Sequence, residues 1–410
     1  MANTLWGKIY FQDAYAGVLQ QEPGGRFAFT YDSSYLESRH SGIAHTLPLQ
    51  EKPHYSEAGL HPFFDNLVAE GWLRNAQARA LGVNRDNRFA LLLAFGRECA
   101  GAVSIIDPEP KKDLRIHATD PEQIAALTSR ASLSGIQPKM LAVREDGGFR
   151  PAAAGETSTH IAKLPSGQLP NIIEIEWLST QAARALLPHE MIVELEVASL
   201  RKVASKVLMI RRFDRTKSGR KLHFEEFNQL FGQKSDDKYQ GSYEQMAGFV
   251  RSTPLCIPAE AEGIFRRVLA CLLIGNTDAH LKNFAMMHTP DGLRLAPAYD
   301  LLASSLYEDY QSVALSLASA RNLNISAVRP KHIVMFGKGC GLGPSAILAA
   351  VEDLGKRLEA AKEAVTGGDA APKGLREKFL QTMERRWNGT FASIGNFLSK
   401  KQGKGGKHGD

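Results

Sequence analysis

The chain lacks the features that mark a membrane or exported protein. Among its 410 residues, the longest uninterrupted apolar runs, FALLLAF from residue 89 and VLACLLI from residue 268, have seven residues each, whereas a membrane-spanning helix needs roughly 20. The first residues, MANTLWGKIYF, show neither the basic start nor the apolar stretch of a signal peptide. We therefore expect a cytoplasmic protein that contacts no membrane.

Cysteine pairs and a strong charge bias are also missing. The four cysteines lie far apart and have no CxxC spacing, which argues against a cysteine-bound metal or a redox pair. The formal net charge is only +6, and +3 of it comes from the last 11 residues, KKQGKGGKHGD. We predict that residues 399–410 form an unstructured basic tail; contact of this tail with nucleic acid is the less favoured interpretation.

The pattern of apolar residues predicts three folded parts. Strand-like alternation in TLWGKIYF and GRFAFTY is followed by helical spacing in HPFFDNLVAEGWLRNAQARALGV, and we assign residues 1–107 to a β-rich N-terminal subdomain. The polar, proline-bearing stretch 107–123 predicts a linker. Short strands predict a second β-rich lobe over 108–215, and helical patterns predominate over 216–398. The expected fold class is α+β.

The stretch IGNTDAHLKNF, residues 274–284, brings polar groups to the end of an apolar, helix-like run. Asp278 and Asn283 stand five positions apart, the spacing at which kinases place a proton-accepting Asp and a magnesium-binding Asn. A second carboxylate, Asp300, follows a predicted hairpin whose turn is Asp291-Gly292. Mg²⁺ prefers such oxygen ligands. The spacing alone is weak evidence, because D-x-x-x-x-N is expected by chance in a chain of this length.

Two more polar side chains lie in the same stretch. Lys282 is placed to offset phosphate charge, and His280 either braces the loop by hydrogen bonding or is an ordinary structural histidine. A metal site made of Asp278, His280 and His288 is an alternative, although no fourth soft ligand stands nearby.

Candidate phosphate-binding residues precede this stretch. Lys163 closes the short apolar run in THIAKLP, where a kinase needs a strand lysine to neutralise nucleotide phosphates. A helix follows with Glu174 and Glu176, either of which is able to pair with Lys163, and Glu176 is preferred. The alternative is a strand-end lysine that reaches solvent.

The segment RASLSGIQPKM, residues 130–140, has the composition of a loop over phosphates. Such a loop needs small residues, so that backbone N–H groups approach the anion, and a positive charge. Ser132, Ser134 and Gly135 are small, and Lys139 carries the charge. With one glycine the segment is neither a Walker loop nor G-x-G-x-x-G, and an ordinary turn between strands is the competing interpretation.

The strand MIRRFDR, residues 209–215, leads into the helical region, which is where a kinase hinge reads adenine through its backbone. Asp214 would then reach a ribose hydroxyl. Taken alone, RRFDR is only a charged strand end.

Together these segments resemble the HipA toxins, serine/threonine kinases of bacterial toxin–antitoxin pairs, over nearly the whole chain. The matching segments stand in family order: SLSGIQPK, THIAKLP, the Glu-bearing helix, RRFDR, QLFG followed by KY at 238–239, IGNTDAHLKNF and LAPAYDLLAS. The N-terminal part is similar in HTLPLQ, HPFFDNLVAEG and GRECAGAVSI. The resemblance implies a two-lobed, protein-kinase-like fold with a β-rich N-lobe, an extra N-terminal subdomain and an all-helical C-lobe.

The resemblance also implies ATP and Mg²⁺ as cofactors and assigns roles to residues. Asp278 would be the catalytic base, Asn283 and Asp300 would bind magnesium, and Ser132 would be autophosphorylated to switch the enzyme off, with Ser134 as second candidate. Arg211 and Phe213 would hold adenine through their backbone. The full set of expected nucleotide-binding residues is Ser134, Gly135, Gln137, Lys139, Lys163, Arg211, Phe213, Asp214, His280 and Lys282.

Family analogy further implies a HipB-like helix-turn-helix antitoxin as partner, operator DNA bound through that complex, and an aminoacyl-tRNA synthetase as protein substrate. Two other functions remain open. One is a catalytically silent corepressor scaffold for the antitoxin, and the other is a small-molecule or lipid kinase. The presence of base, metal ligands and phosphate lysine argues against the scaffold, and the complete N-terminal part argues against the metabolite kinase.

Overall fold

The computed structural model describes residues 5–38, 40–110, 121–128, 132–133, 137–367 and 370–405. It contains two compact units. The first comprises Met1–Pro170 and Glu194–Asp237, and the second comprises Asn171–Val193 and Lys238–Asp410. The N-terminal subdomain and the second β-rich lobe thus fall in one unit, whereas the Glu-bearing helix predicted after Lys163 belongs to the other.

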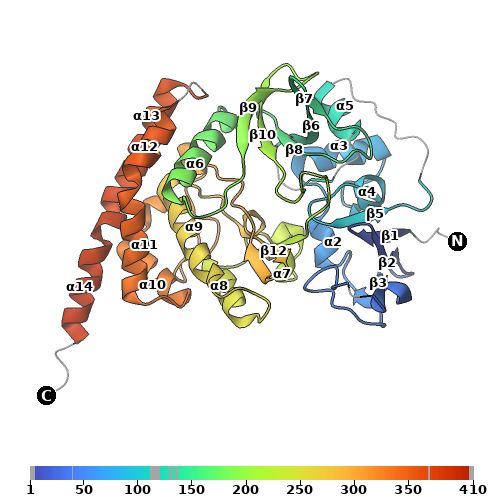
Figure 1. Cartoon of the computed structure of the whole chain (residues 1–410), viewed down its shortest axis with the longest axis horizontal. Helices are drawn as coiled ribbons and strands as arrows, with labels where there is room; N and C mark the ends of the chain where they lie inside the picture. The colour runs from blue at the N-terminus through green and yellow to red at the C-terminus, as the bar shows by residue number, and fades with distance from the viewer. Residues whose placement is uncertain are drawn as a thin grey trace. The chain divides into compact units, whose positions relative to one another are not determined.

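The N-terminal part of the first unit is an antiparallel sheet of five strands in the order β4-β3-β2-β1-β5. Alternate residues of β1 are buried, as its period of two predicts, because successive strand side chains point to opposite faces. Helix α4 packs beside β5 (Figure 1). The elements are β1 Trp6–Phe11, β2 Ala14–Gln21, β3 Phe27–Tyr31, α1 Ser33–Leu36, β4 His54–Ser56, α2 Pro62–Asn66, α3 Gly71–Leu81, α4 Arg88–Phe95 and β5 Val103–Ile106.

A second antiparallel sheet of five strands follows, in the order β7-β6-β8-β10-β9. The apolar runs KMLAV, HIA and VLMI predicted here as strands supply its buried core. A helix, α5, begins inside the segment predicted to be a linker. The elements of this part of the chain are α5 Pro121–Thr128, β6 Lys139–Glu145, β7 Gly148–Pro151, β8 His160–Lys163, β9 Leu195–Ser199, β10 Lys206–Arg211, the strand β11 Phe224–Glu226, which lies outside this sheet, α7 Phe227–Leu230 and the 3₁₀ turn η1 Ser235–Asp237.

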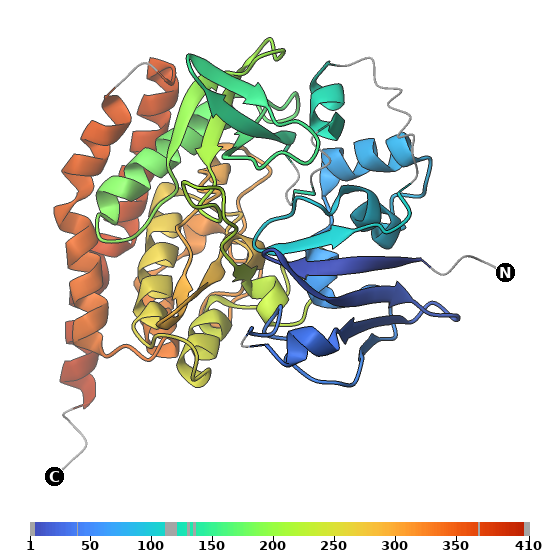
Figure 2. The same cartoon turned by 45° about the vertical axis from the view of Figure 1, so that its right-hand side comes forward.

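The second unit is mainly helical and contains the predicted hairpin, β12 paired with β13; its turn is Pro290-Asp291, one residue earlier than predicted, because Gly292 already pairs with Thr289. Helix α12 packs along α6, and α13 lies beside α12 (Figure 2). Its helices are α6 Ile172–Leu186, α8 Tyr243–Ser252, α9 Glu260–Ile274, α10 Pro330–Gly339, α11 Pro344–Lys356, α12 Leu358–Thr366, α13 Lys373–Gly389 and α14 Ile394–Gly405. Its strands and 3₁₀ turns are η2 Leu281–Asn283, β12 Ala285–Thr289, β13 Gly292–Leu295, η3 Ser304–Leu306, η4 Ile325–Ala327 and η5 Phe391–Ser393.

Helix α9 is buried on nearly all sides and delivers the polar stretch to its C-terminal end. It stops at Gly275, whose φ is 90°, a left-handed conformation that glycine adopts without steric cost. A Cβ at this position would lie 2.3 Å from the hydroxyl of Ser305. Gly275 is therefore required both for the turn and for the space, and the chain leaves the core directly into the candidate site.

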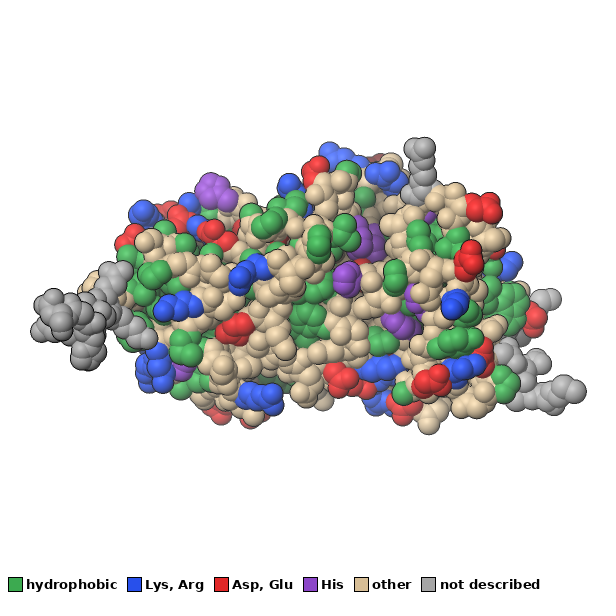
Figure 3. Space-filling view, turned by 90° about the horizontal axis from the view of Figure 1, so that it is seen from below, with side chains coloured by type: hydrophobic (Ala, Val, Ile, Leu, Met, Phe, Trp, Pro, Cys, Tyr) green, Lys and Arg blue, Asp and Glu red, His purple; other side chains and the backbone are tan. Residues whose placement is uncertain are grey.

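Over the described residues, none of the helices combines the length and apolar character needed to cross a membrane. On the face shown in Figure 3, acidic and basic side chains are interspersed with apolar ones. Helix α14 continues to Gly405 and so enters the segment for which the sequence predicts no fixed structure.

Candidate active site

The loop after Gly275 is held in place by Asn276, a residue that sequence reasoning did not single out. Its buried side chain accepts a hydrogen bond from the backbone N–H of Asp278 at 3.1 Å and donates one to the backbone carbonyl of Asp300 at 3.3 Å. Thr277 adds a second anchor, because its hydroxyl donates to the carbonyl of Tyr310 at 2.7 Å. One amide therefore links the candidate base to the candidate metal ligand.

Asn283 and Asp300 meet as the magnesium hypothesis requires. The Asn283 Nδ2 donates to Asp300 Oδ2 at 3.0 Å. The Asn283 Oδ1 is buried and, among the described residues, has no hydrogen-bond partner. A buried carbonyl oxygen without a partner is costly unless something binds it. An amide oxygen beside a carboxylate is a donor set that suits Mg²⁺, so these residues fit the ion.

The backbone of Asp300 is strained. Its φ is 57°, a left-handed conformation that costs a non-glycine residue roughly 1 kcal/mol or more. The hydrogen bond from Asn276 to the Asp300 carbonyl supports this conformation. Such strain clusters at functional sites, where it aims a side chain.

His280 braces the loop, as one of the two sequence interpretations predicts. Its Nδ1 accepts from the backbone N–H of Lys282 at 3.3 Å, and the ring meets the edge of Tyr239 at a centroid distance of 5.1 Å. Lys282 is buried, and its carbonyl accepts from the Tyr299 hydroxyl at 2.8 Å. Within the described chain, Asp278, His280 and His288 do not gather as a metal-ligand cluster, so the alternative metal site is not formed.

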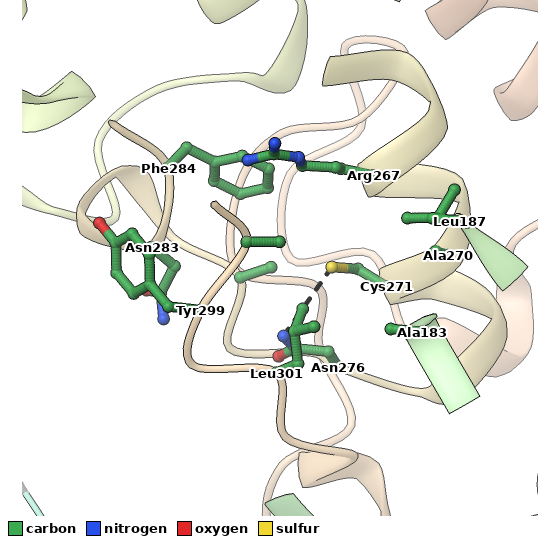
Figure 4. Close-up of a pocket in the computed structure, with 12 residues that line it drawn as sticks. Ala183, Leu187, Arg267, Ala270, Cys271, Asn276, Asn283, Phe284, Tyr299 and Leu301 are labelled. Atoms are coloured by element: carbon green, nitrogen blue, oxygen red, sulfur yellow. Dashed lines mark hydrogen bonds between the residues drawn. The ribbon is translucent and has the colours of Figure 1, made fainter. Parts of the chain in front are cut away.

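Behind the loop, α9 encloses a small pocket (Figure 4). Figure 4 shows Cys271 and Asn276 pointing toward each other, with Sγ and Nδ2 3.9 Å apart. The cavity holds about 10 Å³, which is at most room for one water. Burial raises the pKa of the Cys271 thiol to about 12. The pocket is thus too small for a substrate, and its cysteine stays a protonated thiol rather than a nucleophile.

In the first unit, two candidate phosphate lysines stand opposite each other. Lys139 on β6 is the register partner of Lys163 on β8, and both are buried. Directly opposed residues of antiparallel strands share a face, and like charges there destabilise the sheet. Gln137 is fixed beside them, since its Nε2 donates to the Leu164 carbonyl at 2.8 Å. Two adjacent cations on one strand pair are the arrangement expected for binding a polyanion.

Of the remaining residues predicted for the phosphate loop, the structure describes only Ser132. Ser134 and Gly135 lie outside the described residues. Ser132 is buried, and its hydroxyl donates to the Leu67 carbonyl at 2.6 Å while its N–H donates to the Glu98 carbonyl at 3.2 Å. In this conformation Ser132 is not exposed for modification.

The predicted hinge is an ordered strand end. The N–H of Arg211 donates to the Glu194 carbonyl at 2.9 Å, and its side chain pairs with the Glu194 carboxylate at 3.0 Å. Phe213 packs against Phe224, with ring centroids 4.9 Å apart. Register places Arg211 opposite His160, on the other sheet face from Lys163. Its side chain therefore lies away from the lysine pair, which agrees with a role for the backbone alone.

Glu98, Arg212, Asp214 and Arg215 form a buried charge cluster that sequence reasoning missed. Arg212 donates to both Asp214 oxygens, at 2.9 and 2.7 Å, and Arg215 donates to Oδ2 at 2.9 Å. The two arginines also reach Glu98 Oε1 at 2.9 and 2.8 Å. Glu98 is more than a hundred positions away in sequence, and nothing in its local pattern indicates the contact.

This cluster holds the carboxyl group of Asp214, which the sequence predicts near a ribose hydroxyl. Burial alone would raise the pKa of its carboxyl, but the charges of Arg212 and Arg215 outweigh burial and lower it to about 2. The N–H of Gly101 also donates to Oδ2, at 2.8 Å. Both oxygens are engaged within the cluster, which gives Asp214 a structural role, and its contact with a ribose hydroxyl stays a prediction.

Glu174 and Glu176 both lie in α6 of the second unit. Glu176 is buried, whereas Glu174 faces Tyr307, whose pKa is raised mainly by burial and further by the Glu174 charge. The burial of Glu176 suits a structural pairing role better than that of Glu174. Its pairing with Lys163 stays a prediction.

Comparison with solved structures identifies the fold. A solved structure of HipA from Shewanella oneidensis MR-1, in a complex with HipB and its operator DNA, superposes with a TM-score of 0.77 at 20% identity, covering 95% of this chain and 99% of that chain. The fold is therefore α+β and of the two-lobed, protein-kinase-like type, as predicted. The hairpin β12–β13 is an exception to an all-helical C-lobe.

Sequence comparisons define the family. The HipA N-terminal domain matches residues 7–106, and the HipA-like C-terminal domain matches residues 131–362. Y4dM of Sinorhizobium fredii is 30% identical over 83% of this chain and 87% of its own length. The serine/threonine-protein kinase toxin HipA of Shewanella oneidensis is 24% identical over 87% of this chain and 88% of its own. The chain belongs to the HipA family of kinase toxins, and the resemblance stated from its motifs is confirmed.

Proposed function

We propose that this protein is an ATP-dependent serine/threonine protein kinase that acts as the toxin of a toxin–antitoxin module. The observation that carries the proposal is the buried, partnerless Asn283 Oδ1 beside Asp300, held by Asn276 in one unit with Asp278. A silent scaffold has no need for such a costly arrangement.

Each residue has a task that its position supports. Asp278 accepts the proton of the attacking hydroxyl. Asn283 Oδ1 and the Asp300 carboxylate hold Mg²⁺, which when bound neutralises charge on the phosphates. Lys139 and Lys163, opposed on β6 and β8, neutralise nucleotide phosphates, with Gln137 beside them. The backbone of Arg211 and Phe213 reads adenine.

The partners follow from the family. The Shewanella oneidensis HipA structure is a complex with HipB and operator DNA, and we propose a HipB-like antitoxin for this chain, with operator DNA bound through that complex. We propose a cytoplasmic aminoacyl-tRNA synthetase as the protein substrate, so that phosphorylation stalls translation and causes growth arrest or persistence.

Self-inactivation completes the proposal, with phosphate added to Ser132 or Ser134. Ser132 is buried against the Leu67 carbonyl, and a phosphate dianion is too costly to desolvate in such a place. Phosphorylated Ser132 therefore has to leave its position against the Leu67 carbonyl. Mass spectrometry of the purified chain would show phosphate at residue 132 or 134; phosphate found only elsewhere contradicts this switch.

The proposed function is tested with Asp278→Asn. This variant keeps the side-chain shape but removes the proton acceptor, so phosphate transfer from labelled ATP to a bacterial lysate should fall at least 100-fold, and growth arrest should be lost. The matched control is Asp291→Asn, the same substitution at an exposed hairpin position, which should retain both. Toxicity and labelling that persist in folded Asp278→Asn would refute the mechanism.

A further inference from the structure

The candidate base is held by a tyrosine that none of the roles above includes. The Tyr239 hydroxyl donates a hydrogen bond to Asp278 Oδ1 at 2.9 Å. The residue is nevertheless 43% exposed. It therefore touches the reacting carboxylate with its hydroxyl while its ring forms part of the surface next to that carboxylate.

Tyr239 is fixed from several sides, although it lies outside any helix or strand. The carbonyl of its neighbour Lys238 accepts from the N–H of Leu281 at 3.2 Å, which ties the two loops together. The ring stands edge-on to His280 at an interplanar angle of 89°, and the Lys238 Nζ lies 5.5 Å from the ring centroid. Edge-to-face rings and a cation over a ring both favour this geometry.

The fixed position of Tyr239 has a direct consequence for catalysis. A general base works only when the carboxylate oxygen that takes the proton is aimed at the acceptor hydroxyl. Asn276 fixes the backbone of Asp278. The hydrogen bond from Tyr239 acts on the carboxylate itself, because it engages Oδ1 and so favours one orientation of the group.

We propose that Tyr239 is the positioning residue of the base Asp278 and that its exposed ring is one wall of the site for the acceptor serine or threonine segment. The proposal deepens the kinase function proposed above and rests on it. In the reaction the acceptor oxygen bonds to the γ-phosphorus as the bond to the ADP oxygen breaks, and its proton passes to Asp278. Tyr239 stays protonated throughout and acts only through Asp278.

The test separates the hydroxyl from the ring. The acceptor is a synthetic peptide that copies residues 126–140 of this chain, which contain both candidate serines. Tyr239→Phe keeps the ring and loses the hydroxyl, so kcat should fall roughly 10-fold, the loss expected for one hydrogen bond to a charged group, with KM for ATP and for the peptide unchanged. Tyr239→Ala should also raise KM for the peptide.

Two controls make the result specific. Tyr310→Phe is the same substitution at a residue that is also 43% exposed and contacts the loop through its backbone carbonyl; it should behave as the native enzyme. Tyr243→Phe removes a buried hydrogen bond to the Ala279 carbonyl, at 3.0 Å, and should lower the melting temperature with little change in kcat. A native kcat in Tyr239→Phe, or an equal fall in Tyr243→Phe, overturns the role of Tyr239.

The two levels of proposal fail separately. If the native chain labels neither the peptide nor a bacterial lysate, or if Asp278→Asn labels them as well as the native chain does, the kinase function itself is wrong. If Asp278→Asn is inactive while both Tyr239 variants match the native enzyme, the kinase function stands and only the inference about Tyr239 falls.

Discussion

Two buried polar groups of this protein differ in whether their oxygens have hydrogen-bond partners. In the first unit, both oxygens of Asp214 meet arginine donors, and those arginines also reach Glu98. In the second unit, Asn283 keeps a buried oxygen without a partner among the described residues, next to an Asp300 with left-handed backbone. The first group is satisfied and structural. The second is left incomplete, which is what a site reserved for a ligand requires.

The largest effect that would test this comparison is expected at Asp214. Replacing Asp214 by Asn leaves Arg212 and Arg215 buried beside a neutral group, and removal of one partner from a buried ion pair costs about 3–5 kcal/mol in the free energy of unfolding. Urea unfolding measures this loss. Asp86→Asn, at an exposed surface pair, is the control and should change stability by less than about 0.5 kcal/mol. A loss below 1 kcal/mol at Asp214 would mean that the cluster is not structural.

The second group should respond the other way. Asn283→Ala deletes a candidate metal ligand, so we expect phosphate transfer to fall roughly 100-fold, about 2.7 kcal/mol in the barrier, with a higher Mg²⁺ requirement. Stability should change by less than about 1 kcal/mol, because the hydrogen bond to Asp300 is lost but an unsatisfied buried oxygen is removed as well. Asn388→Ala, on the exposed side of α13, is the control. A large loss of stability with unchanged activity would reverse the assignment of Asn283.

A smaller effect is expected at a third buried polar group, His61, which should make the stability of the fold depend on pH. Burial lowers the pKa of His61 to about 4, with help from His54 and Lys234, against an unfolded value of about 6.5. Between pH 7 and pH 5 the unfolded state therefore binds a proton at His61 that the folded state does not bind. Because of this difference, the free energy of unfolding falls by about 2 kcal/mol over that range. His61→Asn keeps an acceptor for the N–H of Phe63, which His61 now caps, but cannot titrate.

The variant should lose less stability than the native chain over this pH range, as urea unfolding at pH 5 and pH 7 would show. Its stability at pH 7 serves as the internal control, since the cap is preserved. An equal acid sensitivity in both chains would mean that His61 is not buried as a neutral ring.

Local patterns predicted the elements well because their causes are local. The run before Lys163 became β8, the apolar run ending at Ile274 became α9, and the hairpin formed with its turn one residue before the predicted Asp291-Gly292. The domain organisation was harder. Helix α6 clusters with the second unit and α5 occupies part of the expected linker, since packing between distant segments decides these points.

The candidate site shows the same limit. Spacing selected Asp278, Asn283 and Asp300 as candidates, because the first two lie one loop apart and the third follows a predictable hairpin; their roles in catalysis and magnesium binding stay predictions. It missed the clamp by Asn276, which depends on the backbone of Asp300. It also missed the ion pairs around Asp214, because Glu98 lies too far away in sequence to be associated with them. Ser132 is visible in a motif, but its burial against Leu67 is not.

The lysine pair on β6 and β8 has a practical consequence for anyone who purifies this protein. Since we propose that Lys139 and Lys163 bind phosphates, small multivalent anions such as sulfate or pyrophosphate that bind the native form alone should raise its melting temperature as their concentration rises. The melting temperature measured for the purified protein would then depend on the anion in the buffer.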